Sequence, residues 1–278
     1  MIRIVVDGGV GTVTLARPES RNALTPEMLK SLTAAIDDLG PRVGAVVISG
    51  EGSVFCAGFD LMLCHESRDG SAMRALLIGL DAAVRAMRAC PVPVVVACHG
   101  AAIAGGCALV AGSDFAVADR NAKLGYPVVL LGVSPAVSGP TLIPRVGSGT
   151  ARVRMLDPGL ISGEQAAKTG LVSDLVEGRD EVRPAANRLA ECLAAKGRGA
   201  IVATKNWLGE LDGTAPREPA RVGPSGSAPS LARGALSQDP ARGAQSSPMP
   251  DGLAVSLGLA GGAEERIFLE RFWASRDR

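Results

Sequence analysis

The chain has 278 residues, enough for one large domain or two small ones with a substantial core. Hydrophobic residues make up 47% of it and charged residues 21%, a composition typical of globular proteins. The net charge is +1 without a basic block, and aromatic residues make up only 3%. We therefore expect neither a nucleic acid nor an anionic membrane surface as a partner.

The N-terminal sequence and the cysteines indicate the compartment. Charges at Arg3 and Asp7 are unlike a signal peptide, and no apolar segment reaches about 20 residues, so we expect no membrane span and a cytoplasmic location. No CxxC pair occurs and the chain has 2 histidines, so we expect no metal site. Buried, reduced thiols are the favoured interpretation of the cysteines, namely Cys56, Cys64, Cys90, Cys98, Cys107 and Cys192.

The N-terminal third contains clear element boundaries. Residues 2–15 read as two short strands joined by glycines. A helix follows, with Thr25 as N-cap, Pro26 as its first residue and Gly40-Pro41 as its stop.

The middle of the chain alternates strands with helices. We expect buried strands over 43–49 and 92–98, a polar segment over 64–71, an amphipathic helix over 72–89 and a helix over 105–112. This alternation predicts an α/β domain.

Further along, residues 114–119 read as a strand and 140–147 as a helix start or an irregular turn. A capping box, Ser162 with Gln165, opens a helix that ends at Gly170.

Composition changes after about residue 212. We predict a core domain over 1–200 and a C-terminal region over 201–278. Within that region, 213–262 is rich in Pro, Gly, Ser and Ala and reads as a flexible loop or linker, and 263–275 reads as a terminal helix.

Several common enzyme motifs are absent from the sequence. There is no G-x-G-x-x-G after a strand, no G-x-x-x-x-G-K-[ST] and no G-x-S-x-G. A dinucleotide site, a Walker-type phosphate loop and an α/β-hydrolase elbow are therefore not expected.

Two glycine-bearing segments follow buried strands and suggest a shared use. "FCAG" follows the strand over 43–49, and "AIAGG" follows the strand over 92–98 and opens a helix. Backbone N–H groups from two strand ends can point at one oxygen, and a helix N-terminus adds partial positive charge. This arrangement suits a thioester carbonyl that becomes an enolate.

The stretches "RNALTPEML", "VVISGEGSVFCAGFDL", "PVPVVVACHGAAIAGGCALVAGSDFAVADRNAKLGYP" and "ISGEQAAKTGLVSDLV" resemble the crotonase superfamily, the enoyl-CoA hydratases and isomerases, over about residues 1–178. The resemblance implies a spiral of ββα units with a C-terminal helical region, assembled as a homotrimer or a dimer of trimers. It implies an acyl-CoA ligand, with coenzyme A as part of the substrate and no other cofactor.

The resemblance also implies site residues. The oxyanion hole falls on the N–H groups of Ala57 and Gly105. The implied ligand-binding residues are Arg21, Ala23, Leu24, Ala57, Gly58, Phe59, Asp60, Gly105 and Gly106. A structural alternative treats 57–60 as an ordinary turn with Asp60 as N-cap, and Gly105-Gly106 as a site of close helix packing, which can hold at the same time.

The acid and base of the family's hydratases are missing. The resemblance places their two glutamates at Ala108 and Val128, and neither side chain can move a proton. Other residues near these positions, none of them a convincing base, are His65, His99, Asp60, Tyr126 and Cys107.

Three hypotheses remain open from the sequence. The first is an enzyme of the hydratase/isomerase type acting on an acyl-CoA, with altered chemistry. The second is a non-catalytic acyl-CoA binder that keeps the oxyanion hole. The third is a scaffold subunit beside active relatives.

Overall fold

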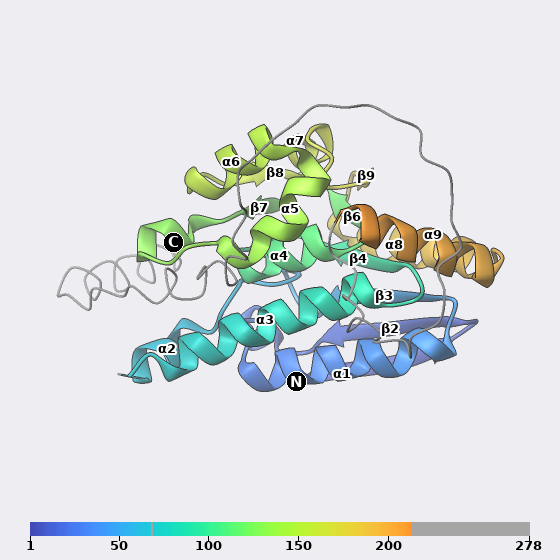
Figure 1. Cartoon of the computed structure of the whole chain (residues 1–278). Coiled ribbons are helices and arrows are strands. Elements are labelled where there is room, and N and C mark those ends of the chain that lie inside the picture. Colours follow the sequence, from blue (N-terminus) through green and yellow to red (C-terminus); the bar gives the residue numbers. More distant parts are fainter. Residues whose placement is uncertain (68, 213–278) are drawn as a thin grey trace, which may run out of the picture.

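Two sheets organise the part of the chain that the computed structural model describes, residues 1–67 and 69–212 (Figure 1). The main sheet has the order β1-β2-β3-β4-β6-β9, and within it only β1 and β2 pair antiparallel. Its strands are β1 (Ile2–Asp7), β2 (Val10–Leu15), β3 (Ala45–Gly50), β4 (Val94–Cys98), β6 (Phe115–Asp119) and β9 (Asp174–Val176). The second sheet consists of β5 (Ala101–Ile103), β7 (Lys123–Gly125) and β8 (Ile161–Ser162).

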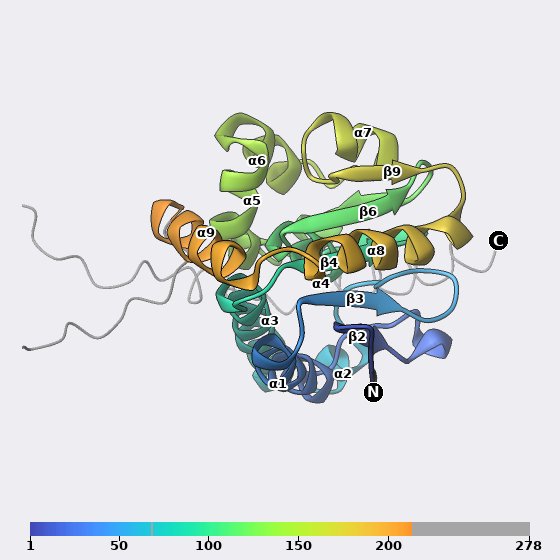
Figure 2. The ribbon, with the colours of Figure 1, turned by 90° about the vertical axis from the view of Figure 1, so that its right-hand side faces the viewer.

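Helices cover both faces of the main sheet (Figure 2). One face packs on α1 (Pro26–Arg42), α3 (Ser71–Ala89) and α4 (Gly105–Gly112), and the other on α8 (Arg179–Ala194). Within β3, Val46 and Ile48 enter the first core, while Ala45 and Val47 enter the second. Because successive side chains of a strand point to opposite faces, a strand covered on both sides is apolar throughout.

Shorter helices complete the chain. They are η1 (Pro18–Ser20), α2 (Leu61–Glu66), η2 (Pro127–Leu131), η3 (Ala136–Ser138), α5 (Gly139–Val146), α6 (Ser148–Leu156), α7 (Gly163–Lys168) and α9 (Arg198–Leu211). Within the described residues, no helix combines the length and the apolar character that a bilayer span requires.

The predicted helix starts are confirmed, and one predicted end is wrong. The Thr25 side chain accepts from the N–H of Met28 at 3.2 Å, and the capping box at the start of α7 forms in full. Helix α1, however, does not stop at Gly40-Pro41 but runs to Arg42. Pro41 removes only one hydrogen bond in the last turn, and the N–H of Val43, two residues on, still bonds the carbonyl of Leu39.

Other predictions need correction. Part of the polar segment 64–71 is helical, because α2 continues to Glu66. Of the two alternatives for 140–147, the helix is confirmed, because the segment lies largely in α5. Cys64 is half-buried and Cys192 is exposed, so the expectation of burial fails for these two, although all six thiols are reduced. The predictions for 213–262 and 263–275 lie outside the described residues, and the division at residue 200 stays a prediction.

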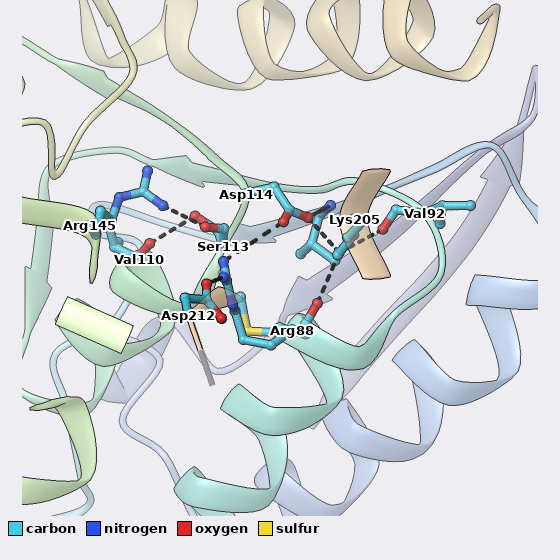
Figure 3. A network of polar contacts seen from close by, with 10 residues as sticks. Arg88, Val92, Val110, Ser113, Asp114, Arg145, Lys205 and Asp212 are labelled. Atoms are coloured by element: carbon cyan, nitrogen blue, oxygen red, sulfur yellow. Dashed lines mark hydrogen bonds and ion pairs between the residues drawn. The ribbon is translucent and has the colours of Figure 1, made fainter. Parts of the chain in front are cut away.

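A polar network fastens α9 to the core (Figure 3). The Lys205 ammonium lies mostly buried and donates to the carbonyls of Met87 at 3.1 Å and Val92 at 2.9 Å, and to Asp114 Oδ2 at 2.5 Å. All three of its donors therefore have acceptors, which is the condition under which a buried ammonium is tolerated.

A second cation at the start of α9 contacts α1. The Arg198 guanidinium donates to the carbonyl of Gly40 at 2.8 Å and to that of Val43. At the other end of α9, Arg88 of α3 pairs with Asp212. Cations at helix C-termini interact favourably with the unpaired carbonyls there, so α9 completes the ends of α1 and α3.

Candidate functional site

Main-chain hydrogen bonds bring three segments together at the carboxyl ends of β3 and β4. Cys56 bonds both neighbours of its β5 partner, at 3.1 and 3.0 Å. The Leu24 N–H donates to the Gly58 carbonyl at 2.7 Å, and the Asp60 N–H donates to the Leu24 carbonyl at 3.0 Å. The loop over 56–60 therefore lies between the 22–24 turn and β5.

The N–H groups of Phe59 and Gly105 have no acceptor within the described residues. Phe59 is the central residue of the bridge to Leu24, so its own N–H and C=O point away from Leu24. Gly105 is the first residue of α4, where helix geometry leaves N–H groups without intrahelical partners. The two residues are adjacent, because a Cβ built on Gly105 would lie 3.2 Å from Cε1 of Phe59.

The N–H of Ala57, which the resemblance assigned to the oxyanion hole, is already engaged. It donates to the carbonyl of Arg21 at 3.0 Å. Along an extended segment the N–H groups of residues two apart point to the same side, so Ala57 and Phe59 can face different sides only if the loop turns between them. Gly58, at φ +95°, is that turn.

A cavity of about 370 Å³ opens beside these groups. Its lining is mostly apolar with a few polar groups, which is the usual composition of a site for a small organic ligand. The polar and charged lining residues are Glu19, Ser20, Arg21 and Asp60. The remaining lining residues are Ala23, Ala57, Phe59, Leu61, Met62, Met73, Ile103, Ala104, Pro127, Val128, Leu130, Leu131 and Val133.

Some predicted ligand-binding residues shape the wall without lining the cavity, namely Leu24, Gly58, Gly105 and Gly106. A Cβ on Gly106 would lie 2.7 Å from the carbonyl oxygen of Cys56, so this glycine permits the close packing of α4 on the 56–60 loop. Ala104, which joins β5 to Gly105, has a strained backbone at φ 49° and ψ −106°. Non-glycine residues hold such angles only where the surroundings enforce them.

Arg17 is a residue of this site that the sequence analysis missed. Its guanidinium donates to the carbonyl of Ala23 at 2.8 Å and through both terminal nitrogens to Asp60 Oδ2 at 3.1 Å. It thereby connects the 22–24 turn to the 57–60 loop, and its partner Asp60 lies 43 positions further along the chain than Arg17. The nearby Arg-Pro pair gives no indication of this long-range contact.

Asn22 supports the same turn from inside and was also missed. It is fully buried at φ 55°, and its side chain accepts from the N–H of Arg17 at 3.0 Å. Its Nδ2 group donates to the carbonyls of Glu51 at 2.8 Å and Val54 at 3.0 Å. Asparagine is the non-glycine residue best suited to the left-handed region, and the Arg-Asn pair in the sequence was a usable signal.

The two vacant acid/base positions differ in location. Val128 lines the cavity, and Ala108 lies inside α4 at 0% exposure within the main core. Two carboxyl groups line the described cavity, those of Glu19 and Asp60. Asp60 is paired with Arg17, and its Oδ1 accepts from the N–H of Met62 at 3.2 Å, so it caps α2 as the structural alternative held.

The other candidate residues lie away from the cavity lining. His65 is exposed on α2, and His99 bonds the carbonyl of Gly52 at 3.1 Å. The Tyr126 hydroxyl is buried, and burial raises the pKa of its phenol well above the usual range. Burial also raises the pKa of the Cys107 thiol to about 11.

Comparison with known proteins connects this geometry to a family. The family model described as "Enoyl-CoA hydratase/isomerase" matches residues 6–212. A crotonyl-CoA hydratase of Syntrophomonas wolfei is 34% identical over 197 residues, which cover 68% of this chain and 74% of that protein.

Solved structures confirm the crotonase-like fold predicted from the sequence. An enoyl-CoA hydratase/isomerase from Xanthobacter autotrophicus has a TM-score of 0.71 and 32% identity, covering 77% of this chain and 81% of its own. An enoyl-CoA hydratase from Mycobacterium smegmatis has a TM-score of 0.70 and 30% identity, covering 75% and 82%.

Proposed function

Since this chain belongs to the enoyl-CoA hydratase/isomerase family, we propose that it binds an acyl-CoA and polarises its thioester carbonyl. The carbonyl oxygen accepts from the N–H groups of Phe59 and Gly105. The observation that carries the proposal is that Phe59 and Gly105 are adjacent residues, each with an N–H group that has no acceptor in the described chain, beside a mostly apolar cavity. The proposal thus differs from the assignment implied by the resemblance, in which Ala57 was the first donor.

The two N–H groups supply what a thioester needs when negative charge develops on its oxygen. Donors fixed by the fold cost no reorganisation when the charge appears. The first turn of α4 adds the partial positive charge of a helix N-terminus. Hydration, isomerisation, decarboxylation and thioester cleavage all develop this charge, so the hole alone does not select among them.

Acid–base catalysis of the family type is not part of the proposal. Val128 is in the cavity where the resemblance implies a glutamate, and Asp60 is held by Arg17. We therefore propose binding and polarisation of the thioester as the retained activity, and not efficient hydration.

Calorimetric titration tests this function directly. We expect butyryl-CoA to bind more tightly than free CoA, because the acyl chain enters the apolar part of the cavity. An infrared spectrum of butyryl-CoA labelled with ¹³C at its carbonyl should show a lowered stretching frequency on binding, as hydrogen bonds to the oxygen require. Equal affinity for CoA and butyryl-CoA, or an unshifted carbonyl band, contradicts the proposal.

A homotrimer or dimer of trimers and a cytoplasmic location are carried forward as proposals from the family resemblance. Light scattering and fractionation of cells test them.

A further inference from the structure

Strand β1 is one edge of the main sheet, and its outer side has no partner among the described residues. Ile4, Val5 and Val6 keep 46%, 52% and 51% of their surface exposed. Edge strands are usually protected by charges, prolines or bulges, because an apolar edge invites another strand. The charges of β1, Arg3 and Asp7, lie near its two ends and leave its apolar middle unprotected.

The hairpin determines which main-chain groups of β1 face outward. The N–H of Ala16 donates to the carbonyl of Met1 at 3.0 Å, in continuation of the β1–β2 register. Hydrogen-bonded and non-bonded residues alternate along an antiparallel pair. The odd-numbered residues of β1 therefore bond β2, and the N–H and C=O groups of Ile4 and Val6 point outward.

We propose that β1 pairs antiparallel with β1 of a second copy of this chain, about a two-fold axis at Val5. In this register Ile4 exchanges both main-chain bonds with Val6 of the second copy. Val5 faces its own symmetry mate, and Arg3 faces Asp7 of the second copy. The outward groups of both strands are thus matched, as an antiparallel ladder requires.

Charge selects this register over its neighbours. A slip by two residues places Arg3 opposite Val5 or opposite Gly9, and the cross-strand ion pair is lost. In the proposed register each copy contributes one Arg3 and one Asp7 to two symmetric pairs, and opposite charges facing each other across strands are stabilising. Arg3 also pairs with Glu51 at 2.5 Å yet keeps 65% of its side chain exposed, so its outer side can reach a second copy.

The proposed contact is small. A ladder of about six residues a side buries less than a standard interface of roughly 1,600 Å², so the association should depend on concentration. The two-fold contact joins two copies of the protein, or two copies of any oligomer that the protein forms through other surfaces, into an assembly of twice the mass. The competing occupant is a segment of the same chain, residues 213–278, which would cover the edge at any concentration.

Disulfide cross-linking tests the register. In a Cys192→Ser background, Val5→Cys places two thiols at a non-hydrogen-bonded pair, where Cα atoms are about 4.5 Å apart, within the range of a disulfide. Ile4→Cys is the matched control, because its symmetry mates lie beyond about 7 Å. Under mild oxidation of the full chain we expect a covalent dimer for Val5→Cys and little for Ile4→Cys. Equal cross-linking of the two variants overturns the proposal.

Charge substitutions test the contact without cross-linking. Val5→Lys places two ammonium groups face to face across the axis, and we expect the dissociation constant of the doubled assembly to rise about tenfold or more. The conservative Val5→Thr should leave it nearly unchanged. Asp7→Lys should weaken the assembly, and Arg3→Glu combined with Asp7→Lys should restore it. A molar mass that Val5→Lys leaves unchanged in a light-scattering dilution series overturns the proposal and indicates the competing occupant or none.

Discussion

One part of the cavity lining presents main-chain donors, and another presents apolar side chains. The side formed by the 57–60 loop and the start of α4 presents main-chain N–H groups, fixed by hydrogen bonds among the 22–24, 56–60 and β5 segments. Another part of the lining, the apolar side around Val128, presents apolar side chains. Side chains change by single substitutions, but main-chain donors persist as long as the fold does. A protein can thus lose proton transfer and keep carbonyl polarisation.

The largest expected effect concerns the apolar side. We expect the wild-type protein to hydrate crotonyl-CoA poorly, because a positioned acid or base contributes about 10²–10⁴-fold. Ala108→Glu with Val128→Glu should raise the rate by about 10²-fold or more over the matched Ala108→Gln with Val128→Gln variant, which has the same size but no proton to transfer. The measurement is loss of the enoyl-thioester absorbance, with thermal unfolding to verify that both variants fold, because buried carboxyls cost stability. Wild-type turnover near values typical of enzymes in general, about 1–10³ per second, would show that another base exists.

The next effect isolates the main-chain side by changing the ligand. Butyryl-CoA and its thioether analogue S-butyl-CoA differ mainly in the carbonyl oxygen. Two hydrogen bonds, each with a net contribution of about 0.5–1.5 kcal/mol, predict roughly 5- to 100-fold tighter binding of the thioester by calorimetry. Identical dissociation constants would mean that Phe59 and Gly105 do not contact the carbonyl. Substituting proline at Gly105 is a poorer test, because Ala104 at ψ −106° does not fit a residue that precedes proline.

A smaller effect concerns the support of that side. Arg17→Met leaves the Ala23 carbonyl and the Asp60 carboxylate without their donor, and we expect a loss of about 1–3 kcal/mol in the free energy of unfolding. If Arg17 positions Phe59, affinity for butyryl-CoA should fall more than affinity for S-butyl-CoA, and Arg17→Lys should restore part of the difference. The control is Arg85→Met, which removes an exposed ion pair with Asp81 and should cost below about 1 kcal/mol. Equal weakening of both ligands would reduce Arg17 to a purely structural role.

The smallest expected effect is a pH dependence of the free energy of unfolding that arises from His99. Burial lowers the pKa of His99 in the folded state, while the unfolded value is near 6.5. The unfolded chain then binds more protons than the folded chain as the pH falls, so the free energy of unfolding should decrease below about pH 6.5. Urea denaturation at pH 7 and pH 5 should show this decrease, and the His99→Gln variant should show a smaller one. A decrease that His99→Gln leaves unaltered would contradict the assignment.

Sequence patterns predicted the elements whose ends are set locally. The hairpin at Gly8-Gly9, with φ of 54° and 82°, and the caps at Thr25 and Ser162 need only neighbouring residues. Helix α8 escaped prediction because its buried face consists mainly of alanines, at Ala186 and Ala190, which give a weak periodic signal.

The site was less predictable for a physical reason. Which N–H faces the cavity depends on the strand that pairs with the loop, and Leu24 pairs with Phe59 from a distant part of the chain. The Arg17–Asp60 pair likewise joins residues that the sequence separates widely. Position along a motif therefore located the loop, but not which of its N–H groups lacks an acceptor in the described chain.

The attachment of α9 has a consequence for biosynthesis. Arg198 and Lys205 donate to carbonyls at the ends of α1 and α3. The bond from Arg198 to Gly40 spans 158 residues, and the bond from Lys205 to Met87 spans 118. During translation, the carbonyls at the ends of these two early helices lack the donors of α9 until α9 has left the ribosome. Contacts this distant are slow to form because the loop must close first. A nascent chain stalled before residue 198 should consequently remain more open to chaperones and proteases than one stalled after residue 212.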